Sequence, residues 1–495
     1  MDRIIKLYKK ILNTKPLGFW SGFIAGLFYF SYIFWFFWSV YPLVLSGINN
    51  QILSFSIILV PFIITVVGMS LFWGIFSFAL FNLFKNEKLN LLPVFYAANF
   101  VLIEYLRTWF FAILWTGQSS LIGPHWTLGN PAYLLAGFGP IRQSASYWGI
   151  YGIDFLIVFS FAALFLLVKN RGNKSKKVLA LEIICIAAIL VLTNLISSQN
   201  KSGSEKEKLT VSSIQTKNPI KILYKPEEIL TDFSEKNRLL KEASKNSDLI
   251  IFPESANFSK SLSGFLDFNN VKKYFNNLSQ KNILIIDNNS ILEKKGVKSK
   301  VILIESKEGI VASYDKKLLT PGGEYIPYLV KLPLLFFEYF QKNNFISSRD
   351  TFIKGTQNNL LDYGNIKIGI LACSDLISPN LSRIENFDFI LNLNNLAVFN
   401  GDLLIEKKLV SMARFRAVEN KKYMVISSNF GHSYIIDPMG NIKISTESNG
   451  YQILTADIVP NQIRTWYNKL GDIPILVLSF LIVLFGLKTT KSRRF

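Results

Sequence analysis

The chain has 495 residues, half of them hydrophobic, and a formal net charge of +20. Its mean hydropathy of +0.29 is too high for an ordinary soluble enzyme, and its apolar residues gather in long runs, so we expect a membrane protein. In such a protein, basic residues usually lie in cytoplasmic loops and against anionic lipid headgroups, so the charge does not indicate nucleic-acid binding. Two histidines and two cysteines nearly exclude a histidine-based triad, a histidine-rich metal site and a disulfide.

Six apolar segments have about the length that a helix needs to cross a bilayer. They span residues 17–40, 52–84, 91–115, 147–168, 178–196 and 473–487. The second is longer than the roughly 20 residues required, so we expect it to be tilted, or broken near Pro61. The sixth is close to the lower limit. The sequence therefore predicts five spans before a large polar region and one span after it.

Lysine and arginine in the short loops indicate the orientation of these spans. Basic clusters precede the first span, follow the second, separate the fourth from the fifth and follow the sixth. With six spans, all four clusters fall on one side, which we expect to be cytoplasmic together with both termini. The chain then divides into a membrane part, 1–199, an extracytoplasmic domain, 200–470, and a C-terminal helix with a basic tail, 471–495.

The region 200–470 alternates short apolar runs with helical stretches, a pattern typical of a mixed α/β layer fold with its chemistry at strand ends. We expect strands at residues 209–214, 249–252, 283–286, 301–304, 366–371, 389–393 and 423–427, and helices at residues 227–245 and 403–419.

Three residues in this domain form a candidate catalytic set. Cys373 ends an apolar run, as a nucleophile at the tip of a buried strand would, and Glu254 closely follows another such run. Alone, Cys373 would more often be a small buried hydrophobic residue. A reactive thiol needs a base, however, and the oxyanion of an acyl transfer needs a cation or hydrogen-bond donors. Glu254 would be the base, Lys316 the cation and Cys373 the nucleophile.

Three further residues are candidates for supporting this set. Glu324 follows Lys316 at a spacing that suits a partner orienting the lysine. The backbone N–H of Ser374 is the expected second donor to the oxyanion. Asp375 is a candidate for a supporting acid.

Residues 325–340 are very apolar for a segment of a water-facing domain. One interpretation is a core helix. We prefer a lid that dips into the outer leaflet, because a large exposed apolar patch usually marks a membrane or ligand site. Residues 396–399 form a candidate smaller arm of the same kind. The side chains expected to contact lipid are those of Tyr325, Tyr328, Phe336, Phe337 and Phe399.

The motifs together resemble the apolipoprotein N-acyltransferases, integral membrane members of the nitrilase (carbon–nitrogen hydrolase) superfamily. The motifs that carry the resemblance are Phe252-Pro-Glu-Ser, Tyr314-Asp-Lys, Pro321-Gly-Gly-Glu-Tyr-Ile-Pro, Cys373, the segments 412–420 and 436–440, and in the membrane part the segments 104–109 and 149–155.

This resemblance implies an αββα sandwich on a helical membrane base in a bacterial cytoplasmic (inner) membrane. It implies that Glu254, Lys316 and Cys373 are catalytic and that Glu324 supports the lysine. The implied reaction is ping-pong: the cysteine takes an acyl chain from a phospholipid as a thioester. It then passes the chain to the N-terminal amine of a diacylglyceryl-cysteine lipoprotein. No metal or organic cofactor is implied, and we expect a monomer.

Several positions depart from the family pattern. The family usually reads Cys-Tyr-Glu at the nucleophile, where this chain has Cys373, Ser374 and Asp375. An Asn-Asp-Ala-Trp-Phe-Gly motif reads here Asn-Leu-Ala-Val-Phe-Asn at residues 395–400, and a histidine common after the lysine is Leu318. These changes leave the catalytic three intact and concern substrate choice and rate.

Two other functions are compatible with these residues. A membrane-tethered amidase of the nitrilase type would use the same three residues on water and a soluble amide, although such a substrate needs no apolar lid. A non-catalytic relative that binds lipid or lipoprotein is compatible with the departures beside Cys373. Replacement of Cys373 should leave only this last function intact.

The third predicted span contains Glu104 and Arg107, one helical turn apart. Charges at membrane depth are costly, so we expect them to pair, either as a structural ion pair or in contact with a headgroup.

Overall fold

The computed structural model describes residues 15–43, 48–83, 92–169, 180, 184, 206–221, 224–341, 352–447 and 450–491. Four segments within this part of the chain are long and apolar enough to cross a membrane, namely Gly18–Val40, Gln51–Phe81, Leu92–Leu114 and Ala145–Val168. A shorter apolar helix, Ile473–Leu487, follows near the C-terminus. These segments confirm a membrane protein with four of the predicted spans. The predicted span at 178–196 lies outside the described residues, apart from two positions.

The helical part contains α2 (Lys15–Ile33), the 3-10 turn η1 (Trp35–Val40), α3 (Gln51–Leu83), α4 (Leu92–Leu114), α6 (Ala145–Lys169) and α15 (Ile473–Lys491). Helices α2 and α3 pack closely because small residues of α2 face α3. A Cβ on Gly22 would lie 2.2 Å from the Trp73 carbonyl oxygen, and one on Gly26 would lie 2.9 Å from the Cα of Ser70. Small residues that let helix backbones approach are typical of membrane interfaces. Helix α3 continues through Pro61, so the predicted alternative of a break there is wrong.

The buried ion pair predicted in the third span is present. The Nε atom of Arg107 lies 2.9 Å from a carboxylate oxygen of Glu104, and both side chains are fully buried. Glu104 also accepts a hydrogen bond from the indole of Trp73 at 3.0 Å, and Arg107 donates to the Leu128 carbonyl at 3.0 Å. The pair is therefore a structural one, bonded to neighbouring protein groups.

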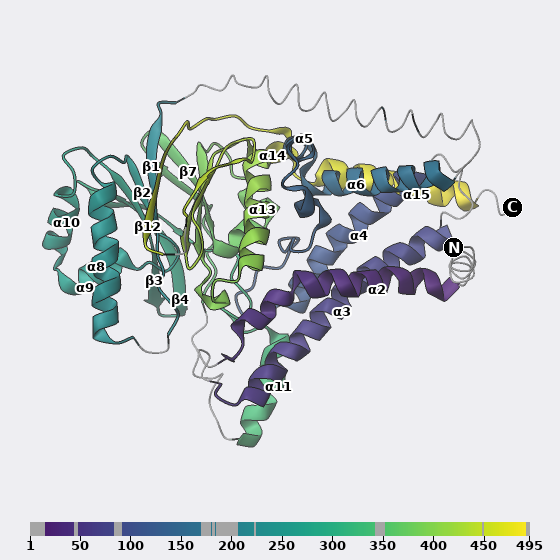
Figure 1. Ribbon diagram of the computed structural model, residues 1–495, viewed down its shortest axis with the longest axis horizontal. Helices are drawn as coiled ribbons and strands as arrows, with labels where there is room; N and C mark the ends of the chain where they lie inside the picture. Colours follow the sequence, from purple (N-terminus) through teal and green to yellow (C-terminus); the bar gives the residue numbers. More distant parts are fainter. Residues whose placement is uncertain are drawn as a thin grey trace.

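The domain beyond residue 206 is a sandwich of two six-stranded sheets (Figure 1). The first sheet has the order β12-β1-β2-β3-β4-β5, from β1 (Leu209–Gln215), β2 (Leu249–Ile251), β3 (Leu284–Glu293), β4 (Gly296–Glu305), β5 (Gly309–Asp315) and β12 (Gln452–Ile458). The second has the order β11-β10-β9-β8-β7-β6, from β6 (Leu360–Tyr363), β7 (Ile366–Ala372), β8 (Phe389–Asn395), β9 (Met424–Asn429), β10 (Tyr434–Ile436) and β11 (Ile442–Ser445).

Helices cover the outer face of each sheet (Figure 1). Helices α8 (Pro226–Ala243), α9 (Phe258–Phe265) and α10 (Phe268–Asn276) pack on the first sheet, and α13 (Leu403–Asn420) packs on the second. Apolar side chains from both sheets, such as Ile251 and Leu391, fill the space between them. The predicted αββα sandwich on a helical base is confirmed.

The strand directions bring the carboxyl ends of the key strands to one edge. Strands β1, β2 and β3 run parallel, and β5 runs parallel to β3 because each is antiparallel to β4. In the other sheet β7, β8 and β9 are parallel. A parallel bridge between Thr216 and Asn429 joins the ends of β1 and β9 across the sandwich. The segments that follow β2, β5 and β7 therefore meet at the same edge.

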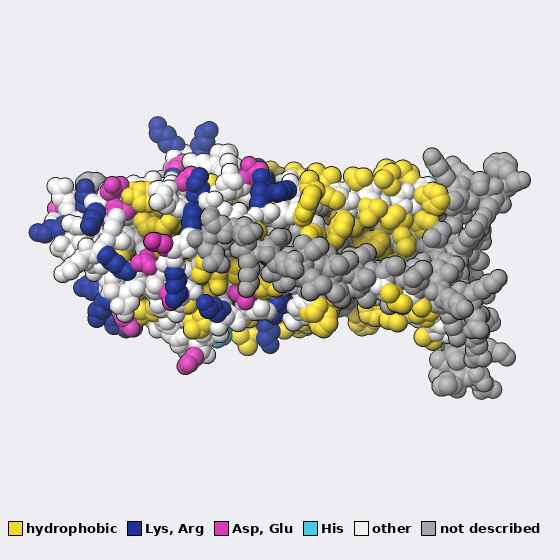
Figure 2. Space-filling view, turned by 90° about the horizontal axis from the view of Figure 1, so that it is seen from above, with side chains coloured by type: hydrophobic (Ala, Val, Ile, Leu, Met, Phe, Trp, Pro, Cys, Tyr) yellow, Lys and Arg dark blue, Asp and Glu magenta, His cyan; other side chains and the backbone are white. Residues whose placement is uncertain are grey.

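The sandwich and the helical part share one apolar core. Phe415 of α13 packs against Tyr133 at 5.6 Å between ring centroids, and the same buried cluster includes Phe30 and Phe111 of the membrane helices. Charged side chains are spread over the sandwich, whereas hydrophobic side chains cover much of the described surface of the helical part (Figure 2). This division of the surface fits a helical part in lipid and a sandwich in water.

Candidate active site

The nucleophile candidate lies where the sequence predicted it, at the tip of a buried strand. Cys373 follows β7 directly and begins a 3-10 turn, η5 (Cys373–Ile377). Its φ of +44° is left-handed, a conformation that is uncommon for non-glycine residues and that recurs at functional sites. The residue is half-buried. The sharp turn therefore presents the thiol at the edge where the strand ends meet.

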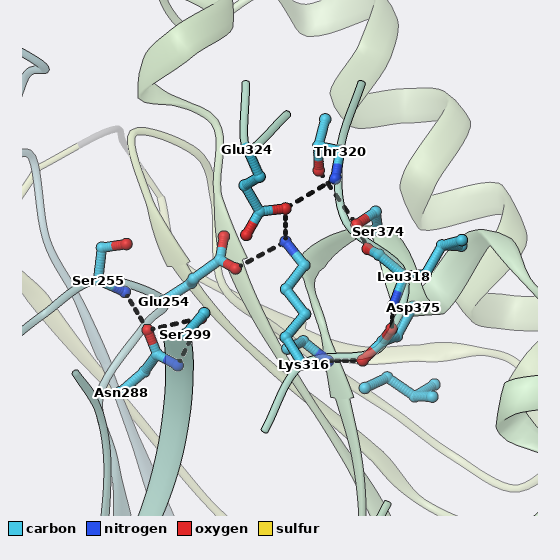
Figure 3. Close-up of polar contacts among 12 residues, drawn as sticks. Glu254, Ser255, Asn288, Ser299, Lys316, Leu318, Thr320, Glu324, Ser374 and Asp375 are labelled. Carbon is cyan, nitrogen blue, oxygen red and sulfur yellow. Dashed lines mark hydrogen bonds and ion pairs between the residues drawn. The ribbon is translucent and has the colours of Figure 1, made fainter. Parts of the chain in front are cut away.

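Glu254 lies in the turn that joins β2 to α9. Two more left-handed residues follow it, Ser255 with φ +60° and Asn257 with φ +51°. Asn288 of β3 holds both: its side-chain oxygen accepts the Ser255 N–H at 2.7 Å, and its backbone carbonyl accepts the Asn257 N–H at 2.9 Å. Figure 3 shows the bond to Ser255, and it also shows the side-chain NH2 group of Asn288 donating a hydrogen bond to the Ser299 hydroxyl. The glutamate is thus fixed by its neighbouring strand.

Lys316 lies between two carboxylates (Figure 3). Its Nζ atom is 2.9 Å from Oε1 of Glu254 and 2.7 Å from Oε2 of Glu324, and its side chain is only 1% exposed. Oε2 of Glu324 also accepts the Thr320 N–H at 2.7 Å. A buried cation is tolerated when it is paired and fully hydrogen-bonded. The structure therefore brings together the predicted base, cation and supporting glutamate.

The electrostatics of the cluster favour a charged lysine and a neutral thiol. Burial lowers the pKa of Lys316, but the charges of Glu254 and Glu324 outweigh this and hold that pKa well above its ordinary value. Burial also raises the pKa of Glu254, against the opposing effect of Lys316. Burial and the neighbouring charge of Glu254 raise the pKa of the Cys373 thiol to about 12. The thiol is therefore protonated at neutral pH and needs the carboxylate beside it as a base.

Asp375 ties the nucleophile turn to the segment after the lysine. Its carboxylate accepts hydrogen bonds from the Tyr314 hydroxyl at 2.8 Å, the Leu318 N–H at 2.8 Å and the Ala372 N–H at 3.1 Å. Burial raises its pKa to about 6, although these hydrogen bonds favour the ionised form. Both carboxylate oxygens of this shorter acid therefore accept hydrogen bonds from neighbouring segments.

Ser374 reinforces the same connection. Its hydroxyl donates to the carbonyl of Leu318 and accepts a hydrogen bond from the Thr320 hydroxyl at 3.1 Å (Figure 3). The leucine itself is in the apolar core. Three of the positions that depart from the family pattern, Leu318, Ser374 and Asp375, therefore contact one another. The role of the Ser374 N–H as an oxyanion donor stays a prediction.

One residue at the site was not predicted to act there. The backbone N–H of Asn395, at the end of β8, forms a hydrogen bond that lowers the pKa of Cys373. The Asn395 side chain accepts a hydrogen bond from Asn429 at 2.9 Å, and Asn429 in turn accepts from the Thr216 hydroxyl at 2.8 Å. A backbone donor leaves no signal in residue type, although the strand preceding Asn395 was predicted.

The residues predicted to contact lipid lie in different environments. Tyr328 begins α11 (Tyr328–Gln341) and is exposed, as is Leu332 one turn later. None of the described side chains of α11 is fully buried, which argues against a core helix, although Val330 packs against the shared core. The helix lies apart from the sandwich, near one end of α3 (Figure 1). Phe399 is half-buried and packs edge-on against Phe36 of η1 at 5.5 Å. The side chains of Phe336 and Phe337 lie outside the described residues.

Tyr325 is buried, unlike a side chain that contacts lipid at the protein surface. Its side chain is 3% exposed, and its hydroxyl donates to the Trp115 carbonyl at 2.8 Å. The aromatic ring is apolar enough to suggest lipid contact, but the hydroxyl anchors it inside the protein. Tyr325 therefore joins the segment that carries Glu324 to the end of α4.

Each of the two histidines forms polar contacts with residues outside the cluster of Glu254, Lys316 and Glu324. Burial lowers the pKa of His125 to about 4, and its Nδ1 atom lies 2.8 Å from the Ser378 hydroxyl. The Nδ1 atom of His432 lies 2.8 Å from a carboxylate oxygen of Glu406. Among the described residues, no group of three or more His, Cys, Asp or Glu is placed to hold a metal ion.

The sequence model of the carbon–nitrogen hydrolase family matches residues 210–468, just over half of the chain. The chain belongs to the carbon–nitrogen hydrolase family. The match begins at the second residue of β1 and covers the strands of both sheets, so the family domain is the sandwich that carries Glu254, Lys316 and Cys373.

Two relatives of this carbon–nitrogen hydrolase extend the similarity into its membrane part. A protein of Geobacter metallireducens named apolipoprotein N-acyltransferase is 26% identical over 387 residues, which cover 73% of this chain and 70% of the relative. A protein of the same name from Coxiella burnetii is 25% identical over 487 residues, covering 96% and 92% of the two chains. A solved CN-hydrolase superfamily protein of Xanthomonas campestris has 17% identity and a TM-score of 0.37, covering 51% of this chain and 91% of its own.

Proposed function

We propose that this membrane protein is a phospholipid:apolipoprotein N-acyltransferase. The observation that carries the proposal is the placement of Lys316 Nζ, within 2.9 Å of both Glu254 and Glu324, beside a strand-end cysteine. The two relatives described above are named apolipoprotein N-acyltransferase, and they match most of the length of this chain. This similarity supports an N-acyltransferase with a lipoprotein acceptor. The catalytic roles of Glu254, Lys316 and Cys373 and the use of a phospholipid as the acyl donor are parts of this proposal.

In the first half-reaction, Cys373 attacks the carbonyl carbon of a phospholipid acyl ester. The thiol proton moves to Glu254 as the carbon–sulfur bond forms, which removes the need for a free thiolate. The resulting oxyanion is stabilised by the Lys316 ammonium and by the N–H of Ser374. Collapse of the tetrahedral adduct breaks the ester bond, and Glu254 returns the proton to the departing alkoxide. The products are a lysophospholipid and a Cys373 thioester.

In the second half-reaction, the N-terminal amine of a diacylglyceryl-cysteine lipoprotein attacks the thioester carbonyl. Glu254 takes a proton from the attacking nitrogen, and the same donors stabilise the second oxyanion. The carbon–sulfur bond breaks, and the sulfur regains its proton from Glu254. The amide product leaves, and the site returns to its starting protonation state. This cycle uses only residues of the chain.

The surroundings of the site suit a donor that stays in a bilayer. The acyl ester must reach Cys373 while its tail remains in an apolar environment. Exposed apolar side chains of α11, such as Tyr328 and Leu332, would contact lipid as a lid. Phe399 of η6 (Ala397–Phe399) packs against Phe36 at the end of the first span. Phe336 and Phe337 belong to the same proposed lid.

The proposal includes an orientation. Both termini would lie in the cytoplasm, and the domain 200–470 would face the extracytoplasmic side of a bacterial inner membrane. The membrane part would be 1–199, with 471–495 as the last helix and tail. The basic clusters around the predicted spans support this arrangement through the positive-inside rule. We further propose that the protein acts as a monomer.

The test is intact-protein mass spectrometry after incubation with mixed phospholipids, comparing the wild type with Cys373→Ala. An acyl adduct on the wild type alone, removed by hydroxylamine, is the expected result because thioesters react with hydroxylamine. Absence of an adduct, in detergent and in bilayers alike, would exclude the acyltransferase. Hydrolysis of a soluble amide by the wild type alone would then identify an amidase of the nitrilase type. Lipoprotein binding retained by Cys373→Ala would identify a non-catalytic relative.

A further inference from the structure

The loop between α4 and η4 (Pro131–Leu135), residues 115–130, connects the membrane helices to both halves of the site. One part of this loop contacts the segment that carries Glu324. The Trp115 carbonyl accepts the Tyr325 hydroxyl at 2.8 Å, and the Thr116 carbonyl accepts the Tyr328 N–H at 2.9 Å. A bridge between Gly117 and Pro327 adds a strand-like contact. This part of the loop therefore holds the segment that follows the catalytic lysine.

A later part of the same loop contacts the nucleophile turn. The Thr127 hydroxyl donates to the carbonyl of Ile377 at 2.6 Å, and Ile377 is the last residue of the turn that Cys373 begins. Two residues earlier, His125 Nδ1 lies 2.8 Å from the hydroxyl of Ser378. These bonds fix the far end of a five-residue turn and so restrict the direction of its first residue.

A relay of buried donors fixes the direction of the Thr127 hydroxyl. A hydroxyl has one hydrogen to donate, and the carbonyl of Ile377, which can only accept, takes that of Thr127. The Tyr133 hydroxyl lies 2.7 Å from Thr127 and must then be the donor between those two hydroxyls. Arg416 of α13 donates to Tyr133 at 3.2 Å. All these side chains are buried, so water cannot readily replace the bonds of Thr127.

The base of the loop is anchored in the membrane part. Arg107, paired with Glu104, donates to the carbonyl of Leu128 beside Thr127. The indole of Trp115 donates to the Thr65 hydroxyl of α3 at 3.1 Å. The loop is therefore bonded to two membrane helices as well as to the two catalytic segments.

We infer that the loop 115–130 sets the position of Cys373 relative to Lys316, with Thr127 and Tyr325 as positioning residues for the acyl transfer. The inference rests on the proposed function for its rate effects, because it takes Cys373 as the nucleophile. Neither residue need touch the substrate. Each acts through the backbone segment that it holds, and small misplacements of reacting groups slow catalysis strongly.

The test compares Thr127→Val, which keeps the shape but removes the hydroxyl, with Thr127→Ser, which keeps the hydroxyl. The matched control is Thr446→Val, because Thr446 is a buried threonine with hydroxyl bonds to Gln215 and Ser433 in another part of the sandwich. We expect Thr127→Val to slow single-turnover formation of the acyl adduct about ten- to a hundredfold, with an unchanged half-saturating phospholipid concentration. Thr127→Ser should stay close to the wild type, and Thr446→Val should lower only the melting temperature.

Tyr325→Phe tests the other half of the loop. The ring is retained, so a lipid contact would survive, but the bond to the Trp115 carbonyl is lost. We expect a lower single-turnover rate at saturating lipid. A raised half-saturating concentration with an unchanged maximal rate would instead assign Tyr325 to lipid binding and overturn its positioning role.

Alkylation of Cys373 by iodoacetamide at pH 8, in a Cys185→Ala background, separates failure of the inference from failure of the proposed function. It needs no lipid or lipoprotein. Burial and the charge of Glu254 both raise the pKa of this thiol. A thiol that is less closely held in the site should lose part of both effects, so Thr127→Val should alkylate faster than the wild type while Thr127→Ser and Thr446→Val do not. If the wild type forms no adduct, the proposed function fails, and alkylation still decides the positioning role. Equal alkylation and adduct rates for Thr127→Val and the wild type would overturn the inference.

Discussion

The Nζ atom of Lys316 lies 2.7 Å from a carboxylate oxygen of Glu324, and the same oxygen accepts the backbone N–H of Thr320 at 2.7 Å. Glu324 therefore orients the lysine and closes the turn between them at the same time. With Glu254 on its other side, Lys316 shares a buried site with two negative charges. This excess of negative charge keeps the lysine protonated. Burial, with a smaller contribution from the charge of Glu324, raises the pKa of Glu254 and makes it a stronger base than an isolated glutamate.

Glu324→Gln tests that arrangement. Loss of one negative charge should lower the pKa of both Lys316 and Glu254, because the charge of Glu324 raises both. A weaker base accepts the thiol proton less readily, so we expect acyl-adduct formation to slow about tenfold or more. Single-turnover mass spectrometry measures this rate. Glu308→Gln, at a surface carboxylate of the same domain, is the control, and an equal rate for both variants would exclude the role of Glu324.

Alkylation of Cys373 should report its raised pKa directly. With a pKa of about 12, the thiolate fraction rises about tenfold per pH unit across the range from 7 to 10, whereas an ordinary cysteine reaches a plateau above its pKa of about 8.5. The iodoacetamide rate constant, measured in a Cys185→Ala background, should follow this slope without a plateau below pH 10.

Glu254→Gln should change alkylation and catalysis in opposite directions. Removing the neighbouring negative charge lowers the pKa of Cys373, so alkylation at pH 8 should become faster. Acyl-adduct formation should be lost because the base is gone. A plateau near pH 8.5 in the wild type, or parallel changes in the two rates, would contradict the assignment of Glu254 as the base.

Tyr314→Phe should destabilise the nucleophile turn in a pH-dependent way. The hydroxyl donates to Asp375 at 2.8 Å in a buried site, and a lost hydrogen bond to a charged group costs about 1.5–3 kcal/mol. The folded-state pKa of Asp375, about 6, is above its unfolded value. The folded protein therefore holds the proton more tightly, and the free energy of unfolding falls as the pH rises from about 4 to 6.

Removing the hydroxyl should raise the folded-state pKa of Asp375 further, since the bond favours the carboxylate. The fall in stability should then continue above pH 6 in Tyr314→Phe, and the difference from the wild type should be larger at pH 8 than at pH 5. Thermal unfolding in detergent at both pH values measures this. Tyr363→Phe, which removes a hydroxyl bonded to Glu308 at the surface, should show no such difference. A loss for Tyr314→Phe that is equal at both pH values would contradict the mechanism.

The elements that carry the candidate catalytic residues were predictable because buried strands leave a continuous apolar signal that ends abruptly at a polar residue. All seven predicted strands and both predicted helices are present, with ends that differ mostly by a few residues. The turns that follow β2 and β7 place Glu254 and Cys373 as the pattern indicated. The apolar pattern does not encode which strands lie side by side, because pairing depends on contacts between distant segments.

The strands that were not predicted lack a continuous apolar run, and the structure gives the physical reason. Every residue of β11 is exposed, and Leu361 is the one buried residue of β6; both strands lie at a sheet edge. The first half of β4 is largely half-buried, so only its apolar second half was predicted. Short or solvent-facing strands carry little hydrophobic periodicity. The roles of Asn395 and Thr127 depend on backbone groups of distant segments, which residue type alone does not encode.

The ion pair of Glu104 and Arg107 offers a last test, because it supports the loop that holds the nucleophile turn. Removing one partner of a buried pair leaves an uncompensated charge and costs about 3–5 kcal/mol. Arg107→Met also removes the donor to the Leu128 carbonyl, beside Thr127. We therefore expect a lower melting temperature in detergent and slower formation of the acyl adduct. The double variant Glu104→Gln/Arg107→Met has no unpaired charge and should recover most of the stability but not the rate, since the bond to Leu128 stays absent. Recovery of both would mean that the pair stabilises the helices without influencing the site.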